Sequence, residues 1–487
     1  MNPIGKQSRS KTGFADLYLE RYGSGSVEGL PGPDPDLFLI VTIPAFKEPD
    51  LATSVLSLLA CEQPGVQWEI LVNINYPENS RPDVIELSRQ SMADVKQVSD
   101  NLTRTDVRIH CLWSPDLPAR HAGVGLARKI VMDLAVRRFN SIGRPDGVIL
   151  SFDADSTCET SYLRSVARYY LRNPSVRTAN IYFEHPLTGG FDPHIFHSIA
   201  QYELYLRYMR LAIEGTGHPH SIHTVGSSFS LKCKTYIRVN GMGRDKAGED
   251  FYFLHKCIQL KGFWEINETA VYPSVRESDR VSFGTGASIR QLLSEASLKV
   301  YNFDSFKPLQ KVFSQVGEYW STSPRRQPAS PFPPAPPPRG QALRKEWVSS
   351  RQIPGSDNRQ QTADTSASPS DRTLSEVEGQ LELQWEAISP GLAEFMKSRN
   401  AAKRIGEMRR DSAREETFRA KFFAWFNGFM VLQYLNAMHK QHYSKMPVLH
   451  EASRLASILG IPAAVSAEDL LLNYRNFERG RGNRKII

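Results

Sequence analysis

The 487-residue sequence contains only five cysteines, an odd number without any CxxC pair. A chain of this length needs no disulfides to hold a core together, so the cysteines predict reduced, partly buried thiols in a cytoplasmic protein. Residues 1–36 lack the apolar segment of a secretory signal peptide. The longest apolar runs have the length of a strand and fall short of the roughly 20 residues that a spanning helix needs. Membrane contact is therefore expected to be peripheral at most, at the inner face of the membrane.

Several catalytic signatures are also missing. The sequence has no GxSxG elbow, no GxxxxGK[ST] loop, no HExxH motif and no zinc-type cysteine spacing. The formal charge of +8 is a small excess among 60 basic and 52 acidic residues. It predicts an ordinary mixed surface, although a nucleotide diphosphate or an anionic lipid would also suit it, and no nucleic-acid partner is expected.

Short buried strands alternate with helices through the first third of the chain. The run LFLIVTIPA is continuously apolar and β-branched, as in a strand that is covered on both faces. The pattern predicts an α/β fold with a doubly wound, mainly parallel sheet, in which ligands bind beyond the carboxyl ends of the strands. Strands are expected at 37–45, 69–74, 107–113 and 148–152, and helices at 51–61, 82–98 and 125–139.

Composition divides the chain into four parts: a flexible segment at 1–30, a catalytic domain at 31–320, a linker at 321–373 and a helical region at 374–487. The linker contains PRRQPASPFPPAPPPRG and a polar run that cannot offset its chain entropy by burying apolar surface. The helical region contains the aromatic stretch FRAKFFAWFNGFMVLQYLNAMH, which fits an interior helix or an interfacial one. Peripheral membrane attachment through Phe422 to Met430 is therefore a hypothesis.

The sharpest local signal is VILSFDADS, in which a buried strand runs directly into Asp153 and Asp155. In a tight turn both carboxylates can face one divalent cation, and hard oxygen ligands suit Mg²⁺ or Mn²⁺. A DxD triplet alone is more often a solvated turn. Its place at the end of the fourth strand favours a metal site that stabilises a leaving nucleoside diphosphate.

The second signal is AGEDFYFLHKC, in which Glu249 and Asp250 begin a helical pattern. Carboxylates at a helix N terminus gain from the capping donors and the helix dipole, so a purely structural role is an equal alternative. The glycine-rich segment before them is long enough to form the rim of a pocket. Asp250 is accordingly the candidate base that takes a proton from an acceptor hydroxyl.

Two basic elements could bind phosphate. In HAGVGLARKI the glycines allow the backbone to approach a ligand, and Arg128 lies near a helix N terminus. In RESDRVSFGTG, Arg276 and Arg280 precede a glycine-rich turn, which suits a diphosphate clamp. A structural loop with surface salt bridges is nearly as good an interpretation of the second element.

Taken in their order along the chain, the four elements resemble those of family 2 glycosyltransferases with the GT-A fold. The resemblance covers about residues 37–286. The segment VTIPAFKEPD looks like that family's opening motif, which cups the nucleotide. The resemblance implies nucleotide-sugar contacts from this turn through Pro44, Ala45, Phe46 and Glu48. Where the family has an acidic residue that contacts the base, this sequence has VNINYPEN, so Asn73 or Asn75 stands in for it. The Ala-Arg-Asn element appears as Ala127-Arg128-Lys129.

The resemblance further implies that Asp153 and Asp155 hold the metal, that Asp153 also contacts the nucleotide sugar, and that Glu249 and Asp250 form the catalytic Glu-Asp motif of an inverting reaction. Arg276 and Arg280 lie where relatives place basic residues for the diphosphate. No QxxRW motif is present, which implies a soluble, non-processive hexosyltransferase that transfers a sugar from a nucleoside diphosphate sugar to the hydroxyl of a glycan, lipid or small molecule. A nucleotidyltransferase acting on a sugar phosphate and a non-catalytic binding module remain the alternatives.

Overall fold

The computed structural model describes residues 13–24, 29–276, 292, 297–321 and 369–487. The chain divides into two compact units, which we describe separately. The larger unit comprises Met1–Phe313 and Phe423–Ile487, and the smaller one comprises Ser314–Phe422. Residues 423–487, from the region predicted to be helical, belong to the same unit as the sheet. Arg280 and most of the predicted linker lie outside the described residues.

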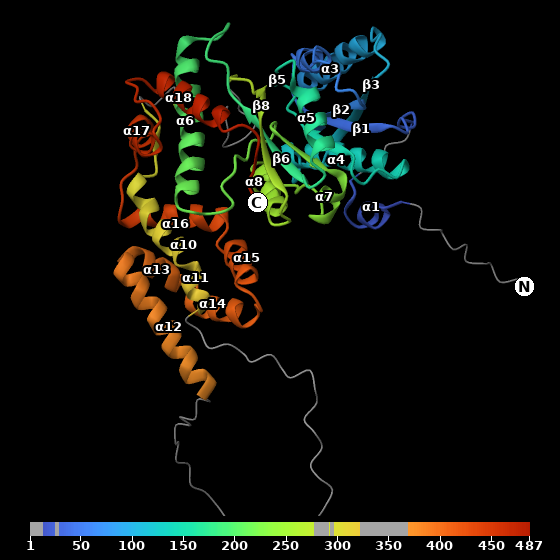
Figure 1. The fold of residues 1–487 in the computed structure, drawn as a ribbon. Coiled ribbons are helices and arrows are strands. Elements are labelled where there is room, and N and C mark those ends of the chain that lie inside the picture. The colour runs from blue at the N-terminus through green and yellow to red at the C-terminus, as the bar shows by residue number, and fades with distance from the viewer. Residues whose placement is uncertain (1–12, 25–28, 277–291, 293–296, 322–368) are drawn as a thin grey trace, which may run out of the picture. The chain divides into compact units, whose positions relative to one another are not determined.

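The larger unit is built on a nine-stranded sheet, which confirms the predicted α/β class (Figure 1). The order along the sheet is β11 (Arg484–Lys485), β8 (Phe263–Tyr272), β6 (Thr178–Phe183), β7 (Phe229–Lys232), β4 (Val148–Ser151), β1 (Leu37–Ala45), β2 (Gln67–Pro77) and β3 (Val107–Leu117). Parallel pairing joins β1 to β2 and β4, β2 to β3, and β6 to β8, whereas β7 runs antiparallel to both of its neighbours. The short strand β5 (Thr157–Cys158) pairs with β8 outside this order.

Helices cover both faces of the sheet because its central strands are apolar on both sides. In β1, Leu39, Val41 and Ile43 belong to one buried cluster, and Leu37 and Ile40 belong to the other. The first cluster includes side chains of α2 (Leu51–Leu59), α3 (Pro82–Asp100) and α5 (Tyr162–Arg172). The second includes side chains of α4 (Val124–Ser141), α7 (Cys233–Arg238) and α8 (Glu249–Ile258).

A short helix, α1 (Asp16–Tyr22), lies within the segment that the sequence predicted to be flexible. Its Tyr18 hydroxyl donates to Asp133 Oδ1 at 2.7 Å, and the Ser24 amide donates to Asp133 Oδ2 at the same distance. Lys129 Nζ lies 2.9 Å from the same carboxylate. These contacts attach α1 to α4. Composition did not reveal them, because the partner carboxylate lies more than a hundred residues away.

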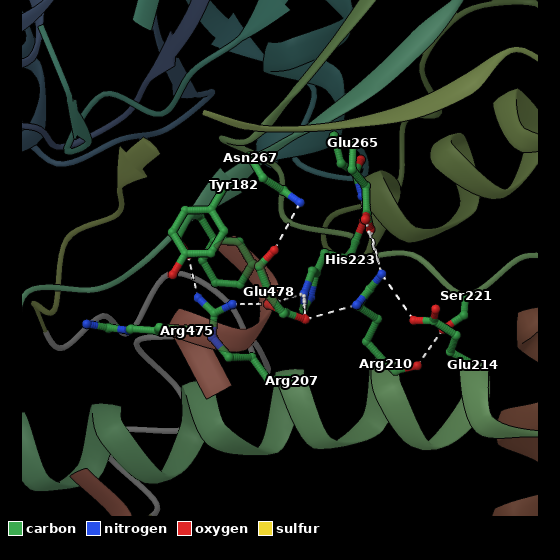
Figure 2. A network of polar contacts seen from close by, with 12 residues as sticks. Tyr182, Arg207, Arg210, Glu214, Ser221, His223, Glu265, Asn267, Arg475 and Glu478 are labelled. Carbon is green, nitrogen blue, oxygen red and sulfur yellow. Dashed lines mark hydrogen bonds and ion pairs between the residues drawn. The ribbon is translucent and has the colours of Figure 1, made fainter. Parts of the chain in front are cut away.

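The C-terminal helix α18 (Ala467–Gly480) is attached to α6 (Pro193–Gly215) by a buried network of charged groups (Figure 2). Glu478 contacts Arg207, accepts from Arg210 Nη1 at 3.0 Å, and lies 3.2 Å from His223 Nε2. Arg210 also donates to Glu265 of β8 at 2.8 Å. After α18 the chain adds β11 to the edge of β8. The C terminus therefore completes the sheet of the larger unit.

We expect Glu478→Gln to destabilise the larger unit by about 3 kcal/mol or more, because the buried guanidinium groups of Arg207 and Arg210 then lose a negatively charged partner. The measurement is the free energy of unfolding by urea at neutral pH. Glu468→Gln is the matched control. Glu468 lies on the same helix but pairs with the half-exposed His197, so its loss should cost less than about 1 kcal/mol. Equal losses in the two variants would show that the network does not hold α18.

Other segments of the larger unit follow β8. They include a two-stranded sheet of β9 (Lys299–Val300) and β10 (Met446–Pro447). The helical elements are η1 (Phe303–Phe306), α10 (Lys307–Ser314), which runs one residue into the smaller unit, α16 (Gly428–Gln441) and α17 (Val448–Leu459).

The smaller unit is helical and has its own core around Trp385, whose indole nitrogen donates to the Tyr319 hydroxyl at 3.3 Å. It contains α11 (Val316–Ser321), α12 (Pro369–Ile388), α13 (Pro390–Ser398), α14 (Ala401–Arg410) and most of α15 (Glu415–Trp425).

The aromatic stretch considered for membrane attachment is largely buried. Phe422 and Phe426 are fully enclosed and Phe423 is nearly so, whereas Phe429 remains 42% exposed. Attachment to a membrane through Phe422 to Met430 stays a prediction. Among the described residues, no helix combines the length and apolarity needed to cross a membrane.

Candidate active site

The turn after β4 and the start of α8 meet at one arginine. Arg128 of α4 is buried, and its Nη2 donates to Asp153 Oδ1 at 2.6 Å. Its Nη1 binds Glu249 Oε1. The two acidic pairs identified in the sequence are separated by almost a hundred residues, and one guanidinium group joins a member of each.

Burial and charge act in opposite directions on these groups. Burial disfavours the charged guanidinium, but the carboxylates of Asp153, Glu249 and Asp250 outweigh it and raise the pKa of Arg128. Burial raises the pKa of Glu249 to about 7, with Arg128 opposing the shift and Asp250 adding to it. Burial also raises the pKa of Asp250, and the charge of Arg128 opposes that shift. The acidic pair thus titrates closer to neutrality than ordinary carboxylates do.

Close packing fixes the guanidinium group in place. A Cβ atom added to Gly226 would lie 2.8 Å from Arg128 Nη2, so the backbone of this residue lies against the guanidinium plane. The Gly226 carbonyl in turn accepts from Ser151 Oγ of β4 at 2.7 Å. Any side chain at Gly226 would displace Arg128 from its carboxylates. The position therefore requires glycine because of close approach rather than backbone conformation.

A second cluster of charge lies beside the turn after β4. Arg276 Nη2 lies 2.6 Å from Glu48 Oε2, in the turn after β1, and 3.8 Å from Asp155 Oδ2. The Glu48 side chain is 3% exposed, whereas the Arg276 side chain remains 27% exposed. Burial lowers the pKa of Arg276, but Glu48 and Asp155 raise it further than burial lowers it. The structure thus brings together Glu48, Asp155 and Arg276.

Asn73 and Asn75, which were predicted to contact the nucleotide base, make hydrogen bonds within the fold. Asn73 Nδ2 donates to the Ala127 carbonyl at 3.0 Å, and its Oδ1 accepts from Ser114 at 2.7 Å. Asn75 Nδ2 donates to the Ala45 carbonyl at 2.9 Å. Both side chains are buried, so they hold the carboxyl ends of β1, β2 and β3 and the start of α4 together. Their contact with a nucleotide base stays a prediction.

The donor set at this site fits a hard divalent cation. The Asp153 and Asp155 side chains are 36% and 28% exposed, so neither carboxylate is enclosed by the fold. Within the described part of the chain, no three His, Cys, Asp or Glu side chains are grouped to hold a metal. Such an ion would therefore need phosphate and water oxygens as its other ligands, as is usual for Mg²⁺.

One feature of the site was missed in the sequence. Ser54 of α2 is buried, and its Oγ donates to the carbonyl of Ala154, the middle residue of the DxD triplet, at 2.7 Å. Nothing distinguishes this serine from other helical serines until the tertiary contact is known. Lys129, by contrast, points to Asp133 and to the attachment of α1, and does not join the acidic cluster.

No protein-family model and no curated protein matches this chain. Among solved structures, it is similar to residues 1–349 of TarS from S. aureus in complex with UDP-GlcNAc, with 13% identity over 57% of this chain and 66% of that one and a TM-score of 0.32. It is also similar to the mannosyltransferase PcManGT from Pyrobaculum calidifontis in complex with GDP-Man and Mn²⁺, with 14% identity, 55% and 61% coverage and a TM-score of 0.29. The chain therefore spans less than two thirds of these relatives' lengths.

Proposed function

We propose that the protein is a glycosyltransferase that moves a sugar from a nucleoside diphosphate sugar to a hydroxyl acceptor with inversion. The observation that carries the proposal is the position of Arg128 between Asp153 and Glu249. Arg128 joins the turn that is the candidate metal site to the acidic pair that contains the candidate catalytic base. Both lie beyond the carboxyl end of a parallel strand. This is where ligands bind in open α/β sheets.

Each residue has a chemical role in this proposal. Asp153 and Asp155 would hold Mn²⁺ or Mg²⁺, which supplies Lewis-acid stabilisation of the diphosphate. Arg276 donates to the phosphate oxygens and offsets their growing charge. Asp250 accepts the proton of the acceptor hydroxyl during in-line displacement. Glu249 stays bound to Arg128 and fixes the start of α8.

The turn after β1 completes the proposed donor site. Pro44 and Ala45 form the end of β1, and Phe46 and Glu48 follow in a turn that contacts Arg276 through Glu48. The partly exposed ring of Phe46 can lie against a nucleoside. Asn75, at the end of the neighbouring strand, is the candidate for contact with the base, because Asn73 is fully enclosed.

Calorimetry with UDP and GDP tests the proposal in the presence and absence of Mn²⁺. We expect binding that requires the metal and is weakened at least about tenfold, roughly 1.4 kcal/mol, by Asp155→Asn. Asp83→Asn, in an exposed ion pair on α3, is the matched control and should bind as the wild type does. Absence of metal-dependent binding would favour a non-catalytic module. Release of pyrophosphate rather than a nucleoside diphosphate would instead identify a nucleotidyltransferase.

The raised pKa values predict a pH dependence for the transfer reaction. Because the base must be deprotonated and burial raises the pKa of Asp250, kcat/KM should fall about tenfold per pH unit below an inflection that lies above the ordinary pKa of an aspartate, and level off above it. Glu249→Gln should move this inflection to lower pH, since Asp250 then loses a negatively charged neighbour and still faces Arg128. A wild-type rate that stays unchanged down to about pH 4 would contradict the base assignment.

A further inference from the structure

Two cysteine side chains are in contact beside the proposed metal turn. Cys61 follows α2 and Cys158 lies in β5, and their Sγ atoms are 3.6 Å apart. The sequence separates them by 97 residues and shows no pairing motif. The other three cysteines are Cys111, Cys233 and Cys257.

The same interface joins the two turns of the proposed donor site. The helix α2 begins directly after the turn that contains Glu48, and Cys158 comes three residues after Asp155. Ser54 Oγ donates to the Ala154 carbonyl at 2.7 Å, and the Cys158 amide donates to Ser57 Oγ at 3.0 Å. The segment from Asp153 to Cys158 is therefore supported along its length by one face of α2.

We propose that Cys61 and Cys158 form a reversible disulfide under hydrogen peroxide, and that this bond weakens nucleotide binding at the adjacent turn. The inference about binding rests on the proposed function. The inference about the bond rests on the contact between the two sulfur atoms.

The chemistry balances with peroxide as the only oxidant. Cys61 sulfur attacks one peroxide oxygen, the O–O bond breaks, and sulfenic acid and water result. Cys158 sulfur then attacks the sulfenic sulfur, the S–O bond breaks, the S–S bond forms, and a second water leaves with the Cys158 proton. Two thiols lose two electrons in total, and one peroxide gains them.

The local environment assigns the two roles. The hydrogen bond with Cys158 lowers the pKa of Cys61, with burial opposing it and Arg104 contributing to it. The same contact raises the pKa of Cys158, with burial adding to the shift. The thiolate is the reactive form of cysteine, which favours Cys61 as the sulfur that reacts first and Cys158 as the one that resolves it. Cys61 is only 5% exposed and Cys158 is the more exposed of the two, so the small size of hydrogen peroxide is needed for this order.

Bond formation must bring the two sulfur atoms closer together. A disulfide has an S–S length of about 2.05 Å, so the sulfur atoms must approach by roughly 1.5 Å. The Cys158 amide is bound to Ser57 and the Ala154 carbonyl is bound to Ser54, so a backbone shift of β5 during this approach is transmitted to the turn that contains Asp155. A shift of that turn would misplace a carboxylate that is proposed to hold the metal and so cost affinity.

Thiol counting on the full-length protein tests the bond without reference to activity. After peroxide treatment and unfolding, we expect the titratable thiols to fall from five to three and a peptide that links Cys61 to Cys158 to appear. Dithiothreitol should restore all five. Cys111→Ser, on β3, is the matched control and should still form the link, whereas Cys61→Ser and Cys158→Ser should not. Five retained thiols, or a link between other cysteines, would overturn the proposal.

Calorimetry with UDP, GDP and Mn²⁺ on oxidised and reduced samples tests the consequence. We expect about tenfold weaker binding after oxidation in the wild type and in Cys111→Ser, and no change in Cys61→Ser. Equal affinity in the oxidised and reduced wild type would overturn the regulatory part. If the reduced protein binds neither nucleotide, the proposed function fails, and thiol counting still decides whether the cysteine pair reacts.

Discussion

Asp250→Asn is expected to lower kcat for sugar transfer by about 10²–10⁴-fold while leaving nucleotide affinity nearly unchanged, because a general base contributes about that much and does not contact the donor. The amide keeps the shape of the side chain and its contact with the Phe251 amide, which the carboxylate makes at 2.8 Å. The measurement is the single-turnover rate of transfer alongside calorimetric affinity for the nucleotide with Mn²⁺. A loss confined to kcat is the signature of a group that acts in the transition state.

Asp245→Asn provides the control for this substitution. Asp245 is exposed and lies five residues before Asp250 in the same loop. It should keep the wild-type rate, which separates the loss of the base from a general effect on the start of α8. Wild-type transfer by Asp250→Asn would remove Asp250 from the mechanism. A loss of nucleotide affinity equal to the loss of rate would assign it to binding instead.

Arg128→Met is expected to have the second large effect, on stability and on binding together. Removing a buried guanidinium leaves Glu249 and Asp153 without their shared partner, and breaking such a pair costs about 3–5 kcal/mol. The freed carboxylate of Asp153 should then change its orientation. Metal-dependent nucleotide affinity should fall by at least about tenfold in the protein that remains folded. Urea unfolding and calorimetry measure the two effects.

Arg138→Met is the matched control, because Arg138 is also a buried arginine of α4. Its Nη2 donates to Glu69 Oε1 at 2.5 Å, on the far part of the helix from the proposed site. It should lose comparable stability and keep its nucleotide affinity below the unfolding temperature. If both variants bind normally when folded, Arg128 has only a structural role. If both lose affinity, the effect reflects stability alone.

The predicted pH profile, the destabilisation expected for Glu478→Gln and the behaviour of the cysteine pair depend on different parts of the larger unit. The pH profile depends on burial of the Glu249 and Asp250 pair. The Glu478 prediction depends on the network between α6 and α18 (Figure 2). The cysteine prediction depends on the interface between α2 and β5. Failure of one therefore does not imply failure of the others.

The amino-acid sequence by itself determined the strands and helices that surround the proposed site. The strand at 37–45 was predicted with its observed bounds, because a short apolar run rich in β-branched residues is typical of a strand that is covered on both faces. Asp153, Asp155, Glu249 and Asp250 were singled out by their places after a strand or at a helix start. Such features are local, and local pattern is what a single sequence records most directly.

Only the tertiary structure decided which of these residues meet. It placed Arg128 between Asp153 and Glu249, gave Asn73 a structural contact, and attached α1 and α18 through Asp133 and Glu478. It also brought Cys61 to Cys158. Each of these contacts joins residues that are distant in the chain, and no periodicity of the sequence encodes the partner of a buried polar group. The need of buried charge for a partner is general, but packing alone selects which partner is within reach.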